Sequence, residues 1–286
     1  MPCGRNIPFA RVAPILLSVV AGCVAVAVLT ASTDALPRQT SAPVPTQTAV
    51  PSATAKARPV VPAPADLQVI DYWTPVRGLP ADPTPTSTMP LPDGLHPTRR
   101  VAVYDAPGGQ PRAFLPPSIS AMPVTVPIVQ RQPGWVAVLL PSVNRTIGWL
   151  PEHSGWQATP LRDQLVLRRR THELTWLRDG LPHATWTVAT GAPATPTPRG
   201  RTFVLGRTQT AGAVYAGLDA LVLGSVPDDP DSVPKSLRGG HTAFHSWHRN
   251  AAFGHSISNG CIRVPRAGQR ALLNTITPGT AVIVLN

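Results

Sequence analysis

The distribution of apolar and polar positions divides the chain into three regions. Residues 12–31 contain no charged side chain. Residues 32–98 mix proline with threonine, alanine and serine and show no sustained helical or strand period. From residue 99 onward, short runs rich in valine, isoleucine, leucine and tryptophan alternate with glycine and proline turns. This pattern predicts an export segment, an extended linker and a mainly β region that contains the core.

The first 31 residues are predicted to be a signal or anchor segment. Arg5 and Arg11 flank the apolar stretch, and about 20 residues suffice to cross a hydrocarbon core. That length favours a retained membrane anchor over cleavage near residues 31–35. Lipidation at Cys23 is the third alternative, and it is less favoured because the sequence stays apolar after the cysteine. Each alternative places the rest of the chain outside the cytoplasm, either membrane-anchored or secreted.

The proline-rich residues 32–98 are predicted to be a tether. The chain has 36 prolines, and they concentrate in its first third, where such a composition buries too little apolar surface to offset the entropy of ordering. Proline also favours extended polyproline II backbone. Residues 67–73, Leu-Gln-Val-Ile-Asp-Tyr-Trp, are the exception. They are either a strand or a short docking segment, and the sequence does not decide which.

Residues 99–156 are predicted to form a small β-barrel. Four short β-rich runs are separated by glycine and proline turns, at 100–104, 123–129, 134–140 and 147–150. The sequence Gly-Trp-Val-x-Val followed by Gly-Trp-Leu-Pro resembles bacterial SH3-like wall domains. Such a module either binds peptidoglycan stems or acts as a spacer beside a second domain, and the spacer is slightly favoured.

Residues 162–286 are predicted to form a second, β-sandwich-like domain with one short helix. The helix is expected at 266–276, after Pro265 and before Pro278-Gly279. The β-branched runs that predict its strands are residues 164–167, 173–177, 184–189, 202–205, 220–224 and 281–285.

The charge of the chain restricts its partners. The formal net charge is +11, and only two of the basic residues are lysines, Lys56 and Lys235. Arginine-biased coding explains this as well as attraction to the anionic polymers of a cell wall does. No basic run is interleaved with aromatic residues, so no nucleic-acid partner is expected.

One cysteine carries the candidate chemistry. Cys3 and Cys23 belong to the export segment, which leaves Cys261 alone in the exported region. A thiol attacks a carbonyl as the thiolate, and His245, sixteen residues upstream, can take its proton. Gly260 lets the backbone turn sharply so that N–H groups can face a developing oxyanion. These residues predict a cysteine acyl-transfer site.

The motif around this cysteine resembles the L,D-transpeptidase (YkuD-type) catalytic domain. Residues 258–263, Ser-Asn-Gly-Cys-Ile-Arg, follow Phe-His-Ser at 244–246 at the family's spacing, and the segments 190–191 and 195–200 resemble its upstream glycine and Thr-Pro elements. The resemblance covers about residues 162–286. Asn259 stands where histidine is commoner, and Ser246-Trp247 stand in place of Gly-Thr.

The resemblance implies a reaction and a set of roles. Cys261 would attack the carbonyl that joins the third and fourth residues of a peptidoglycan stem tetrapeptide, and an amine of a neighbouring stem would resolve the acyl-enzyme into a 3→3 cross-link. His245 would be the base, the Ser246 carbonyl would orient it, and the N–H groups of Gly260 and Cys261 would form the oxyanion hole. The residues expected to shape the turn or contact substrate are Ser258, Asn259, Arg263, His241 and Trp247.

Several alternatives remain beside this interpretation. The same site would serve an L,D-carboxypeptidase or a wall-anchoring transferase, and a decayed site would leave a non-catalytic peptidoglycan-binding protein. A papain-like protease has the opposite order of cysteine and histidine. Zinc binding by the histidines near Cys261 is disfavoured because no carboxylate or second cysteine lies nearby, so no metal or cofactor is expected. We expect a monomer whose partners are donor and acceptor stem peptides.

Overall fold

The computed structural model describes residues 57–143, 145–224 and 241–286. They belong to one compact unit that begins at Ala53. The predicted export segment, and the linker up to residue 56, lie outside the described residues. Within the described ranges, no helix combines the length and the apolar character needed to cross a membrane.

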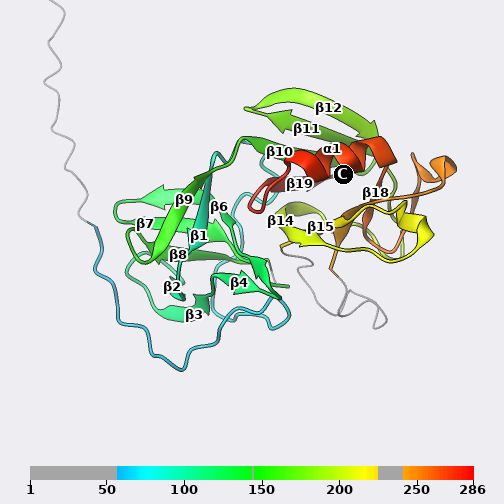
Figure 1. Ribbon diagram of the computed structural model, residues 1–286. Coiled ribbons are helices and arrows are strands. Elements are labelled where there is room, and N and C mark those ends of the chain that lie inside the picture. The colour runs from blue at the N-terminus through cyan, green and yellow to red at the C-terminus, as the bar shows by residue number, and fades with distance from the viewer. Residues whose placement is uncertain (1–56, 144, 225–240) are drawn as a thin grey trace, which may run out of the picture. The chain divides into compact units, whose positions relative to one another are not determined.

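Residues 93–160 form a seven-stranded antiparallel sheet (Figure 1). Strands β7 and β8 are buried along their whole length, as expected for continuous apolar runs. The strand order is β3-β2-β8-β7-β6-β1-β9. The bounds are β1 Asp93–Pro97, β2 Val101–Tyr104, β3 Pro111–Leu115, β6 Val126–Gln132, β7 Trp135–Leu139, β8 Ile147–Pro151 and β9 Trp156–Pro160, with a separate pair β4 Ser118–Ile119 and β5 Met122–Pro123.

The edges of this sheet differ from the boundaries expected at residues 99 and 156. Strand β1 pairs with both β6 and β9, so it belongs inside the sheet although its sequence, Asp-Gly-Leu-His-Pro, contains three residues that disfavour strands. Its backbone is held by neighbours on both sides, which overrides local propensity. The resemblance of this region to SH3-like domains stays a prediction.

Residues 57–92 pack onto the same sheet, where the sequence predicted an extended tether. The Tyr104 hydroxyl donates to the carbonyl of Val61 at 2.6 Å, and the Trp135 indole N–H donates to the carbonyl of Arg58 at 3.1 Å. Ile70, Tyr72 and Val76 are buried in the core of the sheet. A few apolar side chains spaced among prolines are therefore enough to fix this part of the chain, because the sheet supplies the core that the segment lacks.

The second sheet has eight strands in the order β12-β11-β10-β19-β14-β15-β16-β18. Strand β19 lies between β10, to which it is parallel, and β14, to which it is antiparallel. The predicted strands and helix are present, and the mainly β fold is confirmed. The bounds are β10 Asp163–Arg168, β11 Glu173–Arg178, β12 Leu181–Thr187, β14 Gly200–Thr208, β15 Ala220–Leu223, β16 Ala243–Ser246, β18 Ile262–Val264 and β19 Ala281–Leu285, with the parallel pair β13 Thr190–Gly191 and β17 Ser256–Ser258 and the 3₁₀ turns η1 Ala213–Tyr215 and η4 Asn250–Ala252.

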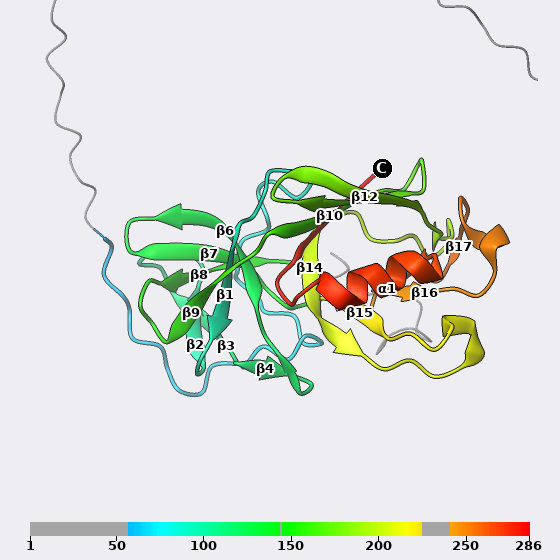
Figure 2. The same ribbon diagram turned by 45° about the horizontal axis from the view of Figure 1, so that its top comes forward.

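The helix α1 (Arg266–Thr275) covers part of this sheet (Figure 2). Leu272 belongs to its apolar core. Gln269 is fully buried, and its side-chain amide donates to the carbonyls of Asp219 at 2.8 Å and Phe244 at 3.2 Å. The helix therefore holds the backbone of β16, the strand that carries His245.

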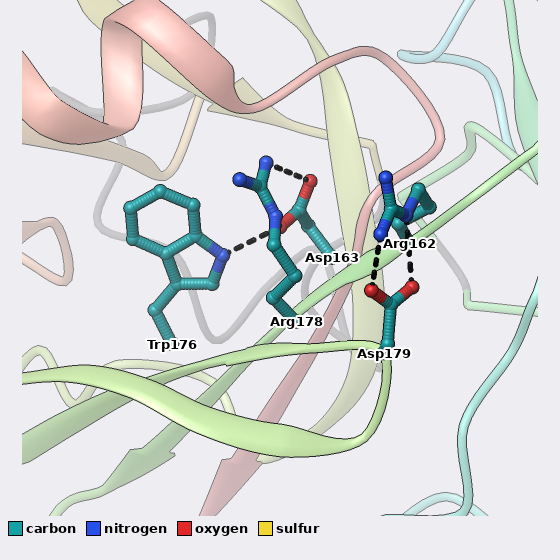
Figure 3. Close-up of polar contacts among 5 residues, drawn as sticks. All are labelled: Arg162, Asp163, Trp176, Arg178 and Asp179. Atoms are coloured by element: carbon teal, nitrogen blue, oxygen red, sulfur yellow. Dashed lines mark hydrogen bonds and ion pairs between the residues drawn. The ribbon is translucent and has the colours of Figure 1, made fainter.

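An acidic residue at the start of β10 anchors the first hairpin of this sheet (Figure 3). Asp163 accepts a hydrogen bond from the Trp176 indole at 2.7 Å and two from the Arg178 guanidinium at 3.0 and 3.3 Å. Its neighbour Arg162 forms a bidentate pair with Asp179, which lies in the next turn, between β11 and β12. The Asp163 side chain is 12% exposed and that of Asp179 is 50% exposed, so only the first cluster is shielded from water.

Strand β14 connects the second sheet to the core of the first. Phe203 and Leu205 belong to the apolar cluster of residues 70–150. Arg201, also on β14, forms a buried bidentate ion pair with Asp82. The segment that precedes β1 is therefore fixed to the second sheet as well as to the first.

Candidate active site

A sharp turn between β17 and β18 presents Cys261. Gly260 adopts a φ of 102°, a conformation that side chains other than glycine rarely adopt. The Ser258 hydroxyl donates to the carbonyl of Cys261 at 2.6 Å and accepts from the N–H of Gly260 at 3.2 Å. This second bond uses the Gly260 N–H that was expected to face the oxyanion, so the resting turn is closed on itself. The exposed Asn259 lies at the rim of the turn.

The Thr-Pro segment noticed in the sequence holds this turn from behind. The Thr197 hydroxyl donates to the carbonyl of Gly260 at 2.9 Å and accepts from the N–H of Gly191 at 2.9 Å. The Thr195 hydroxyl donates to the carbonyl of Ser258 at 3.0 Å. These bonds explain why the two motifs, more than sixty positions apart, occur together.

His245 lies on β16 with its ring oriented by the backbone. Its side chain is 8% exposed, and Nδ1 lies 2.8 Å from the carbonyl of Ser246. Because a carbonyl only accepts, Nδ1 carries the proton and Nε2 is the free base. Burial lowers the pKa of His245 below 6.5; the Ser246 bond opposes this shift, and the charge of Arg263 adds to it. The imidazole is therefore neutral at pH 7.

Strand pairing brings the cysteine and the histidine to neighbouring strands. Strands β16 and β18 are parallel, with Phe244 opposite Ile262 and His245 opposite Arg263. Cys261 directly precedes β18, and its thiol hydrogen-bonds to the backbone of Ala243. Cys261 therefore lies two positions before the strand partner of His245, and positions two apart along a strand face the same side of a sheet.

The thiol itself is held in its neutral form. Burial raises the pKa of Cys261, while the bond to Ala243 and the charge of Arg263 oppose that shift. A raised thiol pKa combined with a lowered imidazole pKa disfavours a resting thiolate–imidazolium pair. The pair can instead react by transferring the proton to His245 as the thiol attacks a carbonyl.

Three side chains surround the histidine. The Arg263 guanidinium lies 3.7 Å from the centroid of the Trp247 ring, a cation–π contact. The Tyr215 ring meets the His245 ring edge-on at 5.0 Å, and the Trp247 ring lies 6.0 Å from it. The Ser246 hydroxyl donates to the carbonyl of Tyr215. Tyr215 was not predicted from the sequence. The one signal for it is that it is a lone aromatic residue in a run of small residues.

The His241 ring packs against aromatic side chains, an environment that does not suit a second base. Its ring lies 4.1 Å from that of Tyr72 and 4.8 Å from that of Trp73, and burial lowers its pKa to about 4. Its backbone carbonyl lies 3.9 Å from the Cys261 sulfur. His248 and His255 are exposed. The two aromatic neighbours come from residues 67–73, whose role the sequence left open.

A cavity of about 360 Å³ lies beside the paired strands β13 and β17. The side chains that line it include three basic groups and no acidic one. They are Arg169, Arg170, His172, Thr190, Ala192, Pro193, Pro196, Ser256 and Asn286, together with Gly191.

Comparison with known proteins agrees with this site. Residues 162–284 match the model of the YkuD family, described as the L,D-transpeptidase catalytic domain. A putative L,D-transpeptidase, YqjB of Bacillus subtilis (strain 168), is 27% identical over 126 residues, which are 42% of this chain and 69% of the relative. The resemblance of the cysteine motif to the L,D-transpeptidase family is therefore confirmed over the catalytic region.

Solved structures of L,D-transpeptidases are also similar at low identity. One from Mycobacterium tuberculosis H37Rv is 17% identical, with a TM-score of 0.38, over 71% of this chain and 98% of that chain. Another, from Mycobacterium smegmatis, is 16% identical, with a TM-score of 0.36, over 50% and 74% of the two chains.

Proposed function

We propose that this protein is an L,D-transpeptidase that forms 3→3 peptidoglycan cross-links through an acyl-enzyme on Cys261. Its substrates would be stem tetrapeptides as donors and the side-chain amines of neighbouring stems as acceptors. Because peptidoglycan lies outside the cytoplasm, the catalytic region would act in the cell envelope, in cell wall biogenesis and the maintenance of cell shape. Anchoring through residues 1–31 and a monomeric state remain predictions.

The reaction would proceed in two balanced steps. The Cys261 sulfur attacks the carbonyl between the third and fourth stem residues while His245 accepts the thiol proton. The C–N bond then breaks, and the departing D-alanine amine takes that proton. In the second step an acceptor amine attacks the thioester, His245 takes a proton from it, and the sulfur leaves as the thiol when His245 returns the proton. The products are a new amide and the free enzyme.

The observation that carries this proposal is the bond between His245 Nδ1 and the Ser246 carbonyl. It leaves Nε2 unprotonated on the strand beside Cys261, and the lowered pKa of His245 keeps the ring neutral, and so able to accept a proton, at neutral pH. A non-catalytic wall-binding protein would have no need of a buried histidine with a fixed tautomer. This favours catalysis over the binding-only alternative.

The molecule that accepts the acyl group distinguishes the remaining candidate functions. Water would make the protein an L,D-carboxypeptidase, and a protein amine would make it a wall-anchoring transferase. The same acyl-enzyme serves all three, so the amine acceptor is proposed on family resemblance. Incubating the full chain with tetrapeptide fragments and measuring dimers and tripeptides by mass spectrometry distinguishes cross-linking from hydrolysis.

Replacing the nucleophile tests the mechanism. Cys261→Ala should give no mass adduct with a carbapenem and no cross-linked product, because no other cysteine is present after residue 23. The variant should keep the circular dichroism and melting temperature of the parent chain. Cross-linking that persists in this folded variant would refute the acyl-enzyme.

A further inference from the structure

The site contains a contact that the matched catalytic region does not supply by itself. Tyr72 and Trp73, which precede the first sheet, lie against His241, and the carbonyl of His241 lies 3.9 Å from the Cys261 sulfur. His241 therefore lies between the nucleophile and Tyr72, which precedes the start of the family match by ninety positions.

The backbone of this segment is held in an uncommon conformation. Tyr72 has a φ of 79°, a region that residues with a Cβ rarely occupy and that is often found at functional sites. Its carbonyl accepts from the N–H of Val143 at 3.0 Å. One residue earlier, Asp71 accepts from the N–H and the hydroxyl of Thr74 at 2.8 and 2.9 Å. The first sheet and this local turn together fix the two rings beside His241.

The two aromatic side chains differ in exposure. Tyr72 is 1% exposed, while Trp73 is 39% exposed and is one of the few large apolar side chains at the surface among the residues that the structure describes. Tyr72 is therefore available only to its protein neighbours, and Trp73 is available to a ligand. Tyr72 also lies close enough to Cys261 for a thiolate to raise the pKa of its phenol, after the larger effect of burial.

The three rings that meet here carry no charge at neutral pH. Tyr72 and Trp73 are uncharged, and His241 is neutral because burial lowers its pKa to about 4. An uncharged aromatic surface suits the peptide groups and methyl side chains of a substrate better than its carboxylates or amines.

We propose that Tyr72 and Trp73 form one wall of the active site, in which Trp73 contacts the uncharged part of a bound stem peptide and Tyr72 is a positioning residue that holds His241 and shields Cys261. This proposal rests on the proposed function for the nature of the ligand, but the shielding of the thiol does not depend on it. The active site is then shared between the matched domain and residues 67–76.

The contact with substrate is tested with Trp73→Ala in the full chain. KM for a tetrapeptide donor should rise about three- to tenfold, the range expected for one lost aromatic contact, while kcat stays within about twofold. Leu181→Ala, which removes a side chain that is 71% exposed on β12, is the matched control and should leave KM unchanged. A KM that is unchanged or lowered in Trp73→Ala would overturn the proposal.

The shielding is tested by the size of the reagent that reaches Cys261. In Tyr72→Ala, the ratio of the alkylation rate with N-phenylmaleimide to that with iodoacetamide should rise several-fold. The reason is that removing the ring widens access to Cys261, which accelerates the bulky reagent more than the small one. Tyr72→Phe, which keeps the ring, should restore the original ratio. Tyr104→Ala removes a buried tyrosine of the first sheet and should not change the ratio.

The two measurements separate this proposal from the proposed function. A higher ratio of N-phenylmaleimide to iodoacetamide alkylation in Tyr72→Ala, in a protein that shows no transpeptidation, would support the wall and refute the proposed function. Normal transpeptidation with an unchanged ratio and an unchanged KM would refute the wall alone. If Tyr72→Ala does not fold, as judged by circular dichroism, the KM of Trp73→Ala decides the outcome.

Discussion

At the scale of single residues, backbone groups rather than side chains orient the candidate base. The Ser246 carbonyl fixes the His245 ring, and any residue at position 246 provides a carbonyl. The Ser246 hydroxyl is used elsewhere, as a donor to the Tyr215 carbonyl. The departure from Gly-Thr after the histidine is thus compatible with an oriented imidazole.

Replacing each histidine in turn should show which one acts as the base. His245→Ala should slow acylation of Cys261 by a carbapenem by roughly 10²- to 10⁴-fold, the usual loss for a general base. His248→Ala and His255→Ala should have little effect because both side chains are exposed, and His241→Ala should cost far less than His245→Ala. Stopped-flow acylation rates of the four variants test this. A crippled His241 variant beside a near-normal His245 variant would reverse the assignment.

The pH dependence of acylation should reflect the environment of His245. Burial lowers its pKa below 6.5, so the basic form persists to more acidic pH than that of a free imidazole. The rate should therefore fall only as pH drops below 6.5, the usual value for histidine, and the acid limb should disappear in His245→Ala. Rates measured from pH 4 to 9 test this expectation, which a midpoint above pH 7 would contradict.

At the scale of elements, most strands were predictable because their apolar runs are local signals. Strands β10 and β11 and helix α1 agree with the expected ranges to within one or two residues. Strand β1 was not predictable because its glycine and proline indicate a turn, and only pairing with β6 and β9 makes it a strand. The pairing of β16 with β18, which places His245 beside the cysteine turn, is likewise a tertiary property.

The two aspartates that pair with arginines near β11, Asp163 and Asp179, offer a test of how shielding from water changes the strength of an ion pair. Asp163→Ala should lower the free energy of unfolding by about 2–4 kcal/mol, because it leaves the Trp176 indole and the Arg178 guanidinium without their shared acceptor. Asp179→Ala removes an exposed ion pair with Arg162 and should cost much less, because water screens such a pair. Urea unfolding of both variants measures the difference. Equal losses would show that the buried cluster has no special role.

At the scale of the whole molecule, the sequence did not predict that residues 57–98 belong to the folded unit. The average composition of this region indicated a tether, and an average hides the few residues that make its tertiary contacts. Asp82 is an example, because nothing local shows that its carboxylate pairs with Arg201 more than a hundred positions later. The site motif, in contrast, was predictable as a short contiguous sequence, while Tyr72, Trp73 and Tyr215 reach it only through the fold.

The extent of the folded unit can be tested by truncation. A chain beginning at Ala53, where the compact unit begins, should remain folded and react with a carbapenem. A chain beginning at Arg99 loses strand β1, the buried core residues Ile70 and Val76, and the partner of buried Arg201. The unpaired buried charge alone should cost about 3–5 kcal/mol, so this chain should aggregate or melt at a much lower temperature in differential scanning fluorimetry. Equal melting temperatures for the two chains would show that residues 57–98 are dispensable.

The central position of β19 has a consequence for how the protein matures. The strand that fills the middle of the eight-stranded sheet, between β10 and β14, follows Cys261 in the chain. Pairing between such distant segments is a slow step in folding. Until β19 inserts, the sheet around the nucleophile is incomplete, and an exported chain would carry an accessible thiol into an oxidising compartment. If the chain is exported as proposed, oxidation of Cys261 should compete with folding until residues 281–285 have paired with β10 and β14.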